Sequence, residues 1–259
     1  TSNTRQILKF VLQTAEISAT ATRKLNNLIL YVNGDSHTAA AECVNNHAFA
    51  CDDPALFMMG RQPHPENFNR SWGKLLSQRL SCALKCDAES ASSNDRILRT
   101  TRDWISNHHG DSYRTLYIIQ WSTWEREEWL IDGNYFQVNA SGIDDVPPSY
   151  QEAYKHYVAN INWQQKTQAA HENIWDFHQE LNELGIKHIF FNGNNTFSDI
   201  EDKQDWGSSY IDPYGTVSFD SVISETCETV SPISYHYGPD GHRKFTQFLT
   251  KYIIDNKMV

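Results

Sequence analysis

A serine that could act as a nucleophile lies near the start of the chain. Gly34, Asp35 and Ser36 directly follow the apolar run 28–32. A serine at the end of a buried strand, where the chain turns into a helix, can expose its hydroxyl, and its own amide can donate to a developing oxyanion. Asp and Ser are also common helix caps, so these residues could instead do no more than cap a helix.

Two histidines near the other end of the chain could supply a general base. His236 and His242 flank the run 237–241, just before an amphipathic segment that predicts a terminal helix. With Ser36, such a histidine would allow acyl transfer, because the imidazole removes the serine proton while the oxygen attacks a carbonyl. We expect His236 to be the base, since His242 would lie inside the helix, where a side chain is less free to meet a serine at a strand end. The alternative is His242 with Asp240 nearby.

The two segments together resemble the motifs of the GDSL-type hydrolases, also called the SGNH family. In that family the catalytic histidine lies in a run of the form His-Pro-Asn-x-x-Gly-His; here His236 matches the first position, and Gly241 and His242 match the last two. The resemblance implies a three-layer α/β/α, flavodoxin-like fold with a parallel sheet. It also implies a serine esterase without a cofactor, acting on a carboxylic ester such as an acyl or acetyl ester of a carbohydrate or lipid. A non-catalytic binding module on the same scaffold and an acyltransferase are the alternatives.

The two middle motifs depart from the family pattern. Where the family has Asn-x-Ala-x-x-Gly, this chain has Cys-Asp-Ala-Glu-Ser-Ala at 86–91, so Ala91 replaces a glycine whose amide helps to form the oxyanion hole, with Ser90 as the nearest alternative. Where the family has Gly-x-Asn-Asp, this chain has Gln-Trp-Ser-Thr at 120–123, and Ser122 takes the place of the asparagine. The resemblance therefore predicts an oxyanion hole formed by the amides of Ser36 and Ala91 and the hydroxyl of Ser122. An alanine keeps the amide, provided that its backbone does not need a positive φ.

The acid that should orient the imidazole is missing from its family position. The family's aspartate lies three residues before the histidine, and Ile233 occupies that position here. A hydroxyl or a backbone carbonyl could orient His236 instead. Asp220, Glu225 or Glu228 could also reach the ring from the preceding segment, so the sequence leaves this group open.

Other side chains near the expected active-site edge could contact a substrate. Trp121, Trp124 and Arg126 lie at or just beyond the end of the third apolar run. Aromatic faces could hold a sugar ring or an acyl chain, and a guanidinium could bind a carboxylate; ordinary core packing is the alternative for each tryptophan. We expect no metal, because His47 and His64 lie in polar loop segments without a recurrent ligand spacing.

Strands that alternate with helices must position these residues. Apolar runs predict strands at 28–32, 82–87, 113–121 and 186–191, and helices are expected at 38–44, 72–80, from 93 onward, over the second half of 150–184 and after 237. This alternation predicts a parallel sheet with helices on both faces. Asp132 and Gly133 between two apolar runs predict an inserted β-hairpin, because both central turn residues need positive φ.

Length and charge limit the function classes. The chain has 259 residues and a formal net charge of -10, so we expect one domain over residues 27–259 after an N-terminal extension, residues 1–26, and no nucleic-acid partner. No apolar run is long enough to span a membrane. We expect a soluble protein, cytoplasmic or exported after removal of a signal that is not present here, with a small-molecule, carbohydrate or lipid ester as its partner.

Overall fold

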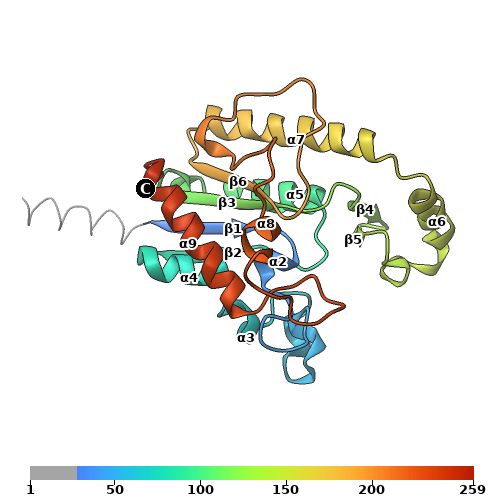
Figure 1. Ribbon diagram of the computed structural model, residues 1–259. Helices are drawn as coiled ribbons and strands as arrows, with labels where there is room; N and C mark the ends of the chain where they lie inside the picture. Colours follow the sequence, from blue (N-terminus) through green and yellow to red (C-terminus); the bar gives the residue numbers. More distant parts are fainter. Residues whose placement is uncertain (1–27) are drawn as a thin grey trace, which may run out of the picture.

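Four parallel strands form the central sheet, as the sequence predicts. In the computed structural model, which describes residues 28–259, the strands are hydrogen-bonded in the order β2-β1-β3-β6 (Figure 1). Their bounds are β1 (Ile29–Asn33), β2 (Ala83–Cys86), β3 (Thr115–Trp121) and β6 (His188–Asn192). This is the order of the first four strands of a flavodoxin-like sheet, and such sheets bind ligands where the chain switches direction, at the carboxyl ends of the strands next to β1.

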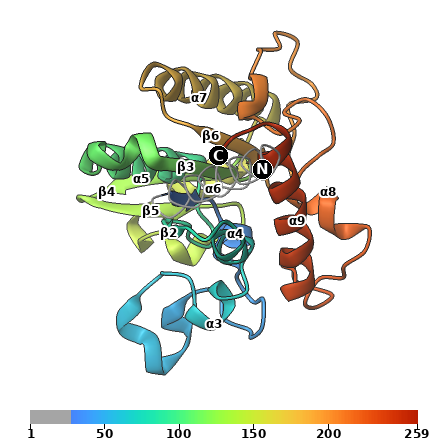
Figure 2. The same cartoon turned by 90° about the vertical axis from the view of Figure 1, so that its left-hand side faces the viewer.

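Helices cover both faces of this sheet, so the predicted three-layer α/β/α class is confirmed (Figures 1 and 2). One face carries α5 (Asn94–Asn107) and α7 (Trp163–Glu183). The other face carries α4 (Trp72–Leu80), α8 (Phe219–Ser224) and α9 (Pro239–Asp255). Because both faces are covered, every residue of β3 and of β6 is buried.

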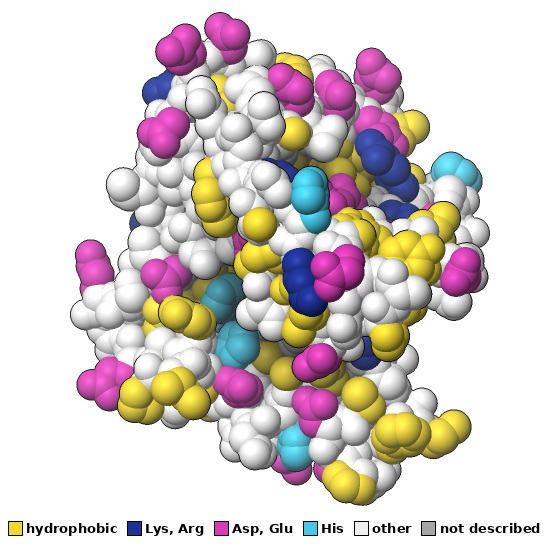
Figure 3. Space-filling view, turned by 90° about the vertical axis from the view of Figure 1, so that its right-hand side faces the viewer, with side chains coloured by type: hydrophobic (Ala, Val, Ile, Leu, Met, Phe, Trp, Pro, Cys, Tyr) yellow, Lys and Arg dark blue, Asp and Glu magenta, His cyan; other side chains and the backbone are white. Residues whose placement is uncertain are grey.

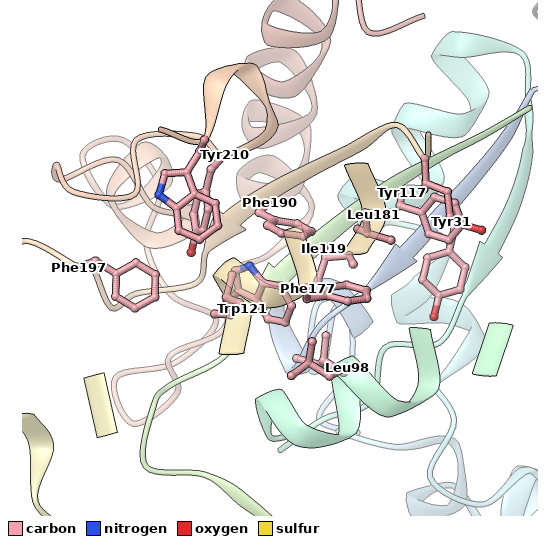
Figure 4. Packing of buried hydrophobic residues seen from close by; sticks show 14 of the residues in the cluster. Tyr31, Leu98, Tyr117, Ile119, Trp121, Phe177, Leu181, Phe190, Phe197 and Tyr210 are labelled. Atoms are coloured by element: carbon pink, nitrogen blue, oxygen red, sulfur yellow. The ribbon is translucent and has the colours of Figure 1, made fainter. Parts of the chain in front are cut away.

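The side chains of each strand alternate between two apolar clusters. Tyr31 and Tyr117 pack with Phe177 of α7 on one face, as Figure 4 shows, whereas Leu30 and Val32 pack toward α4 and α9 on the other. Successive strand side chains point to opposite faces, which explains the separation. The sheet therefore holds the two helix layers together through two independent cores.

The predicted β-hairpin is present beyond the end of β3. Its strands β4 (Glu127–Ile131) and β5 (Asn134–Val138) are antiparallel, and the turn residues Asp132 and Gly133 have φ of 49° and 80°. These angles are the positive values that the sequence pattern requires. The hairpin packs through Val138 against a small apolar cluster that includes a residue of α6 (Gln151–Ala159).

The helix expected at 38–44 is wrong in its extent. The helix α2 (Ser36–Ala39) has only four residues, because Ala40 adopts a left-handed backbone with φ of 57°, and Glu42 does so again with φ of 60°. The polar excursion that follows contains α3 (Pro65–Phe68). Short 3-10 helices complete the described chain at Ala50–Asp52, Pro54–Met59, His109–Arg114, Ile143–Asp145, Pro148–Tyr150 and Gly207–Ser209.

The expected N-terminal extension and the expected absence of a membrane span can be compared with the structure only over the described residues. The N-terminal extension expected over residues 1–26 lies outside the described residues, so the domain division stays a prediction. Between residues 28 and 259, no helix combines the length and the apolar character needed to cross a membrane.

Candidate active site

Ser36 occupies the position that the sequence predicts, at the carboxyl end of β1 and the first residue of α2. Asp35 caps the helix, and its carboxylate accepts a hydrogen bond from the His37 amide at 3.0 Å. The Ser36 side chain itself has no hydrogen-bond partner among residues 28–259. Ser36 is 8% exposed, so its hydroxyl lies at the edge of the protein interior. Asp35 caps the helix, so the Ser36 hydroxyl is not used for capping.

Gly34 is required by close packing in front of this turn. A Cβ atom at this position would lie 2.6 Å from Thr38 Oγ1 and 2.9 Å from Gln120 Cβ. Neither distance is compatible with van der Waals contact, so any side chain would push α2 away from β3. Gly34 therefore fixes the position of Ser36 relative to the sheet.

The ring of His236 is oriented by Glu42, a residue that the sequence analysis did not consider. His236 Nδ1 lies 2.9 Å from Glu42 Oε2. A carboxylate accepts hydrogen bonds, so the neutral ring carries its proton on Nδ1, and Nε2 keeps the lone pair that a general base needs. The ring centroid of His236 is 5.7 Å from that of His37, the residue after Ser36. Ser36 and His236 are not hydrogen-bonded to each other; catalytic hydrogen bonds are often long before substrate binds.

Ser234 holds the Glu42 carboxylate from the same side as His236. Its hydroxyl donates to Glu42 Oε2 at 2.6 Å and accepts from the His236 amide at 3.1 Å. Burial would raise the pKa of the Glu42 carboxyl, but the hydrogen bonds from His236 and Ser234 outweigh it and lower the pKa below its usual value. Glu42 is therefore ionised at neutral pH, as an orienting acid must be.

Backbone strain brings Glu42 to this place. The left-handed conformations of Ala40 and Glu42 are unfavourable for residues with a Cβ, at a cost of about 1–2 kcal/mol each. The turn is held from outside, because Asn67 Oδ1 accepts from the Val44 amide at 2.8 Å and the His47 carbonyl accepts from the Glu42 amide at 3.0 Å. Strained residues that their surroundings keep in place are typical of functional sites.

The three carboxylates that the sequence analysis considered for this role lie elsewhere. Asp220 accepts a hydrogen bond from the Tyr237 hydroxyl. Glu225 and Glu228 are exposed, and neither forms a hydrogen bond or an ion pair with His236. Glu42, and not one of these three residues, contacts the His236 ring. It could not be found from the sequence because it lies 194 residues before His236.

His242, the alternative base, is buried in α9 with a different hydrogen bond. Its Nδ1 accepts from the Trp72 amide at 3.2 Å, so the neutral ring carries its proton on Nε2 and has no free lone pair. Burial lowers the pKa of His242 to about 3. His242 lies inside α9, as expected, and its hydrogen bond to the Trp72 amide is a second reason to prefer His236 as the base.

Asp35 is the centre of a buried hydrogen-bond network that includes two of the predicted site residues. Its carboxylate accepts from Gln120 Nε2 at 2.7 Å, from Ser122 Oγ at 2.8 Å and from an Arg126 nitrogen at 3.3 Å. Burial would raise the pKa of Asp35, but the charges of His37 and Arg126 and these donors lower it. These hydrogen bonds connect the turn at residues 34–36 to the end of β3.

This network commits the only proton of the Ser122 hydroxyl to Asp35. Ser122 is 1% exposed, and Arg126 donates to its oxygen at 2.9 Å. The role of Ser122 as an oxyanion donor stays a prediction, and it would require the bond to Asp35 to open. Arg126 is turned toward Asp35 in the same way, so its contact with a substrate carboxylate also stays a prediction.

Ala91 has a positive φ, so the condition under which an alanine fits this position without strain is not met, although the residue keeps its amide. Its φ is 62°, and the segment that carries it runs beside the nucleophile turn, because the Glu89 amide donates to the Gly34 carbonyl at 3.2 Å. The Ala91 amide has no hydrogen-bond partner among the described residues. Ser90, the alternative, is buried and donates its hydroxyl proton to the Ala48 carbonyl at 2.8 Å.

Trp121 and Trp124 lie in the core and not on an exposed surface. Trp121 packs against Phe177 and Phe190 (Figure 4), and Trp124 stacks on Phe197 with ring centroids 4.7 Å apart. Both are at most 3% exposed. Their positions fit the core packing that was the alternative to a substrate contact.

A groove of about 620 Å³ adjoins the acid side of the site. Figure 3 looks onto the end of the molecule at which the strands stop, and histidine side chains reach this surface between acidic and apolar ones. Glu42 and Ser234 form part of the groove wall, and most of the rest is uncharged: Cys43, Val44, Asn45, Asn46, Val230, Ser231 and Ile233. Its walls could therefore accept an uncharged, partly apolar group.

Comparisons with solved structures give low similarity. A protein assigned to the lipolytic G-D-S-L family from Desulfitobacterium hafniense DCB-2 is 12% identical, with a TM-score of 0.32, over 86% of this chain and 98% of that chain. The psychrotrophic esterase EstA from Pseudoalteromonas sp. is 11% identical, with a TM-score of 0.27, over 89% of this chain and 74% of that chain. The fold assignment above accordingly depends on strand order and layering.

Sequence comparison points to one family. No curated protein matches the chain. Residues 56–191, just over half of the chain, match the family described as "Family of unknown function (DUF6071)". The chain therefore belongs to this family of unknown function.

Proposed function

We propose that this protein is a serine esterase of the SGNH type, with Ser36 as nucleophile, His236 as general base and Glu42 as the acid that orients the base. The observation that carries the proposal is the 2.9 Å contact between Glu42 Oε2 and His236 Nδ1. It supplies the carboxylate that this chain lacks at position 233, where the family motif has an aspartate and this sequence has Ile233. It also leaves His236 Nε2 unprotonated near the helix that begins with Ser36.

The reaction would proceed in two acyl-transfer steps. His236 Nε2 removes the proton from Ser36 Oγ as this oxygen attacks the ester carbonyl carbon, and the resulting imidazolium is stabilised by Glu42. The imidazolium returns the proton to the departing alcohol when the ester C–O bond breaks. His236 then removes a proton from water as the water oxygen attacks the acyl-enzyme. It returns this proton to Ser36 Oγ when the bond between that oxygen and the acyl carbon breaks, and the carboxylic acid is released.

Two backbone amides are available to bind the oxyanion. The Ser36 amide is at the N-terminus of α2, and the Ala91 amide lies on the segment beside Gly34. Backbone donors that need no rearrangement are the usual components of an oxyanion hole. Asp35 and Gln120 would act through the position of the Ser36 turn and would not touch the substrate. Ser122 would donate to the oxyanion only if its bond to Asp35 opens.

The test is the reactivity of Ser36. A fluorophosphonate probe should label the wild-type protein on Ser36, and S36A should lose both labelling and hydrolysis of short p-nitrophenyl esters while it keeps its thermal unfolding midpoint. S198A is the matched control, because Ser198 is exposed and lies outside the site. Equal hydrolysis by wild type and S36A would refute the proposal, and a folded wild type without labelling would indicate a non-catalytic binding module.

Hydrolysis and acyl transfer share the same acyl-enzyme, and their products distinguish them. With an added alcohol or sugar acceptor, a hydrolase releases the free acid, whereas an acyltransferase forms a new ester. We expect the free acid as the main product, with water as the acyl acceptor.

A further inference from the structure

We propose that His47, Asp53 and His64 form a binding site for a divalent transition-metal cation of the zinc type, within the excursion that follows α2. One ligand atom from each of these three side chains lies within 4.8 Å of the others. Two imidazoles and one carboxylate form a common ligand set for zinc, and three protein ligands leave a fourth position for water. Hard cations such as magnesium prefer oxygen ligands alone.

The strongest indication is the buried and unpartnered nitrogen of His64. Although His64 belongs to a polar loop segment, its side chain is only 3% exposed. Its Nε2 has no hydrogen-bond partner among residues 28–259. A buried polar atom without a partner is costly, and a bound ion is one of the few groups that satisfy it.

The distances are close to those of a metal site. His64 Nε2 lies 3.6 Å from Asp53 Oδ2. Ligands at about 2.0–2.1 Å from a tetrahedral zinc are separated by about 3.3 Å from each other. His47 stacks on His64 with ring centroids 5.0 Å apart and an interplanar angle of 24°, and the ligand atoms of the cluster lie within 4.8 Å of one another. The His47 ring must therefore turn for its nitrogen to point at the same cation as His64.

The surrounding residues hold these ligands in place. Asp53 Oδ1 accepts from the Ala55 amide at 2.8 Å, which leaves Oδ2 for the cation. The His47 carbonyl accepts from Asn67 Nδ2 at 2.9 Å. His47 and Asp53 are partly exposed, which gives a cation access from solvent.

The hydrogen bonds of Asn45 must change when the cation binds. Asn45 Nδ2 lies 3.2 Å from His64 Nδ1, so in the metal-free protein the ring carries its proton on Nε2. A cation at Nε2 requires the proton on Nδ1, and the Asn45 amide must then rotate to accept it. Asn45 Oδ1 accepts from the His47 amide at 3.1 Å and from Asn67 Nδ2 at 2.7 Å, so this rotation also breaks those two bonds. Binding is therefore coupled to a local rearrangement.

The site would close a part of the chain that has little apolar core of its own. Within the excursion, Phe57 and Met58 are 68% and 94% exposed. A cation held by residues 47, 53 and 64 would tie its two ends together. Because the His47 carbonyl is bonded to the Glu42 amide, the same cation would also stiffen the turn that carries Glu42.

The test uses the full chain without an affinity tag, stripped with a chelator and titrated with zinc chloride at pH 7.5. We expect one zinc ion per chain by calorimetry and a higher thermal unfolding midpoint, with no response to magnesium. D53N keeps the size and the Ala55 contact but removes the charge, and H47Q removes a partly exposed ligand. Each should weaken zinc binding by at least about tenfold.

H156A is the matched control, because His156 is exposed on α6 and distant in sequence from the cluster. It should bind zinc as the wild type does. The proposal is overturned if the wild type shows no saturable zinc binding, or if D53N and H47Q bind zinc as tightly as H156A. Because the readout is binding and unfolding, the result does not depend on esterase activity.

Discussion

Replacement of Glu42 by glutamine tests the proposed catalytic arrangement most directly. E42Q keeps the side-chain length but removes the negative charge next to His236. A hydrogen bond to a charged group contributes about 1.5–3 kcal/mol. At about 1.36 kcal/mol per tenfold change in rate, its loss from the transition state lowers kcat by about 10- to 150-fold. Since the Glu42 side chain is 30% exposed, solvent screens part of the charge, and we expect the lower half of that range.

The assay measures kcat and KM with a short p-nitrophenyl ester. Glu42 stabilises the imidazolium that forms during the reaction, so in E42Q kcat should fall while KM changes little. E228Q is the matched control, because Glu228 is exposed and was a candidate for the same role from sequence alone. If E42Q and E228Q both stay within about threefold of the wild type, Glu42 does not orient His236 and the reasoning fails.

Three further predictions concern stability. A91G removes the strain of a left-handed alanine and should raise the free energy of unfolding in urea by about 1 kcal/mol; a decrease would contradict the strained conformation. G34A should lower the same quantity by about 1–3 kcal/mol, because the added methyl group overlaps α2 and β3, and an unchanged value would show that the turn is not tightly packed. Burial lowers the pKa of His188 to about 4, and its ring lies 2.8 Å from that of His178. Between about pH 4 and 6.5 the unfolded chain binds a proton at this histidine that the folded chain does not bind, so the free energy of unfolding rises with pH in this range. H188Q should reduce that slope by about 1.4 kcal/mol per pH unit. A slope equal to that of the wild type would mean that this histidine is not kept neutral by the fold.

The strands and the position of Ser36 could be predicted because their signals are local. The run 28–32 is apolar without interruption, and Gly34 to Ser36 carries both the tight turn and the helix cap. The hairpin turn at Asp132 and Gly133 was likewise determined by two adjacent residues with a single common conformation. In each case the physical cause lies within a few residues of the structure that it produces.

Glu42 could not be predicted because its position depends on residues far away in sequence. The alanines at 39–41 favour a helix, and a helix through residue 44 would have carried Glu42 to another face. Contacts with Asn67 and His47 outweigh this preference, which amounts to a few tenths of a kcal/mol per residue. The burial of His64 was hidden for the same reason, since nothing in a polar loop sequence indicates which of its side chains will turn inward.

Ser36 and Glu42 lie close together in sequence, and this limits how the C-terminal loop that carries His236 could be exchanged with that of another protein. The proposed nucleophile and the proposed acid belong to one stretch of seven residues, 36–42, whereas the proposed base comes from the distant C-terminal segment. In the SGNH motif the acid and the histidine lie three residues apart, so a graft of the C-terminal loop from an SGNH hydrolase would bring a second carboxylate. Such a chimera would place two acids next to one imidazole, where like charges oppose each other. Exchange of this loop would therefore succeed only together with the turn at residues 40–42.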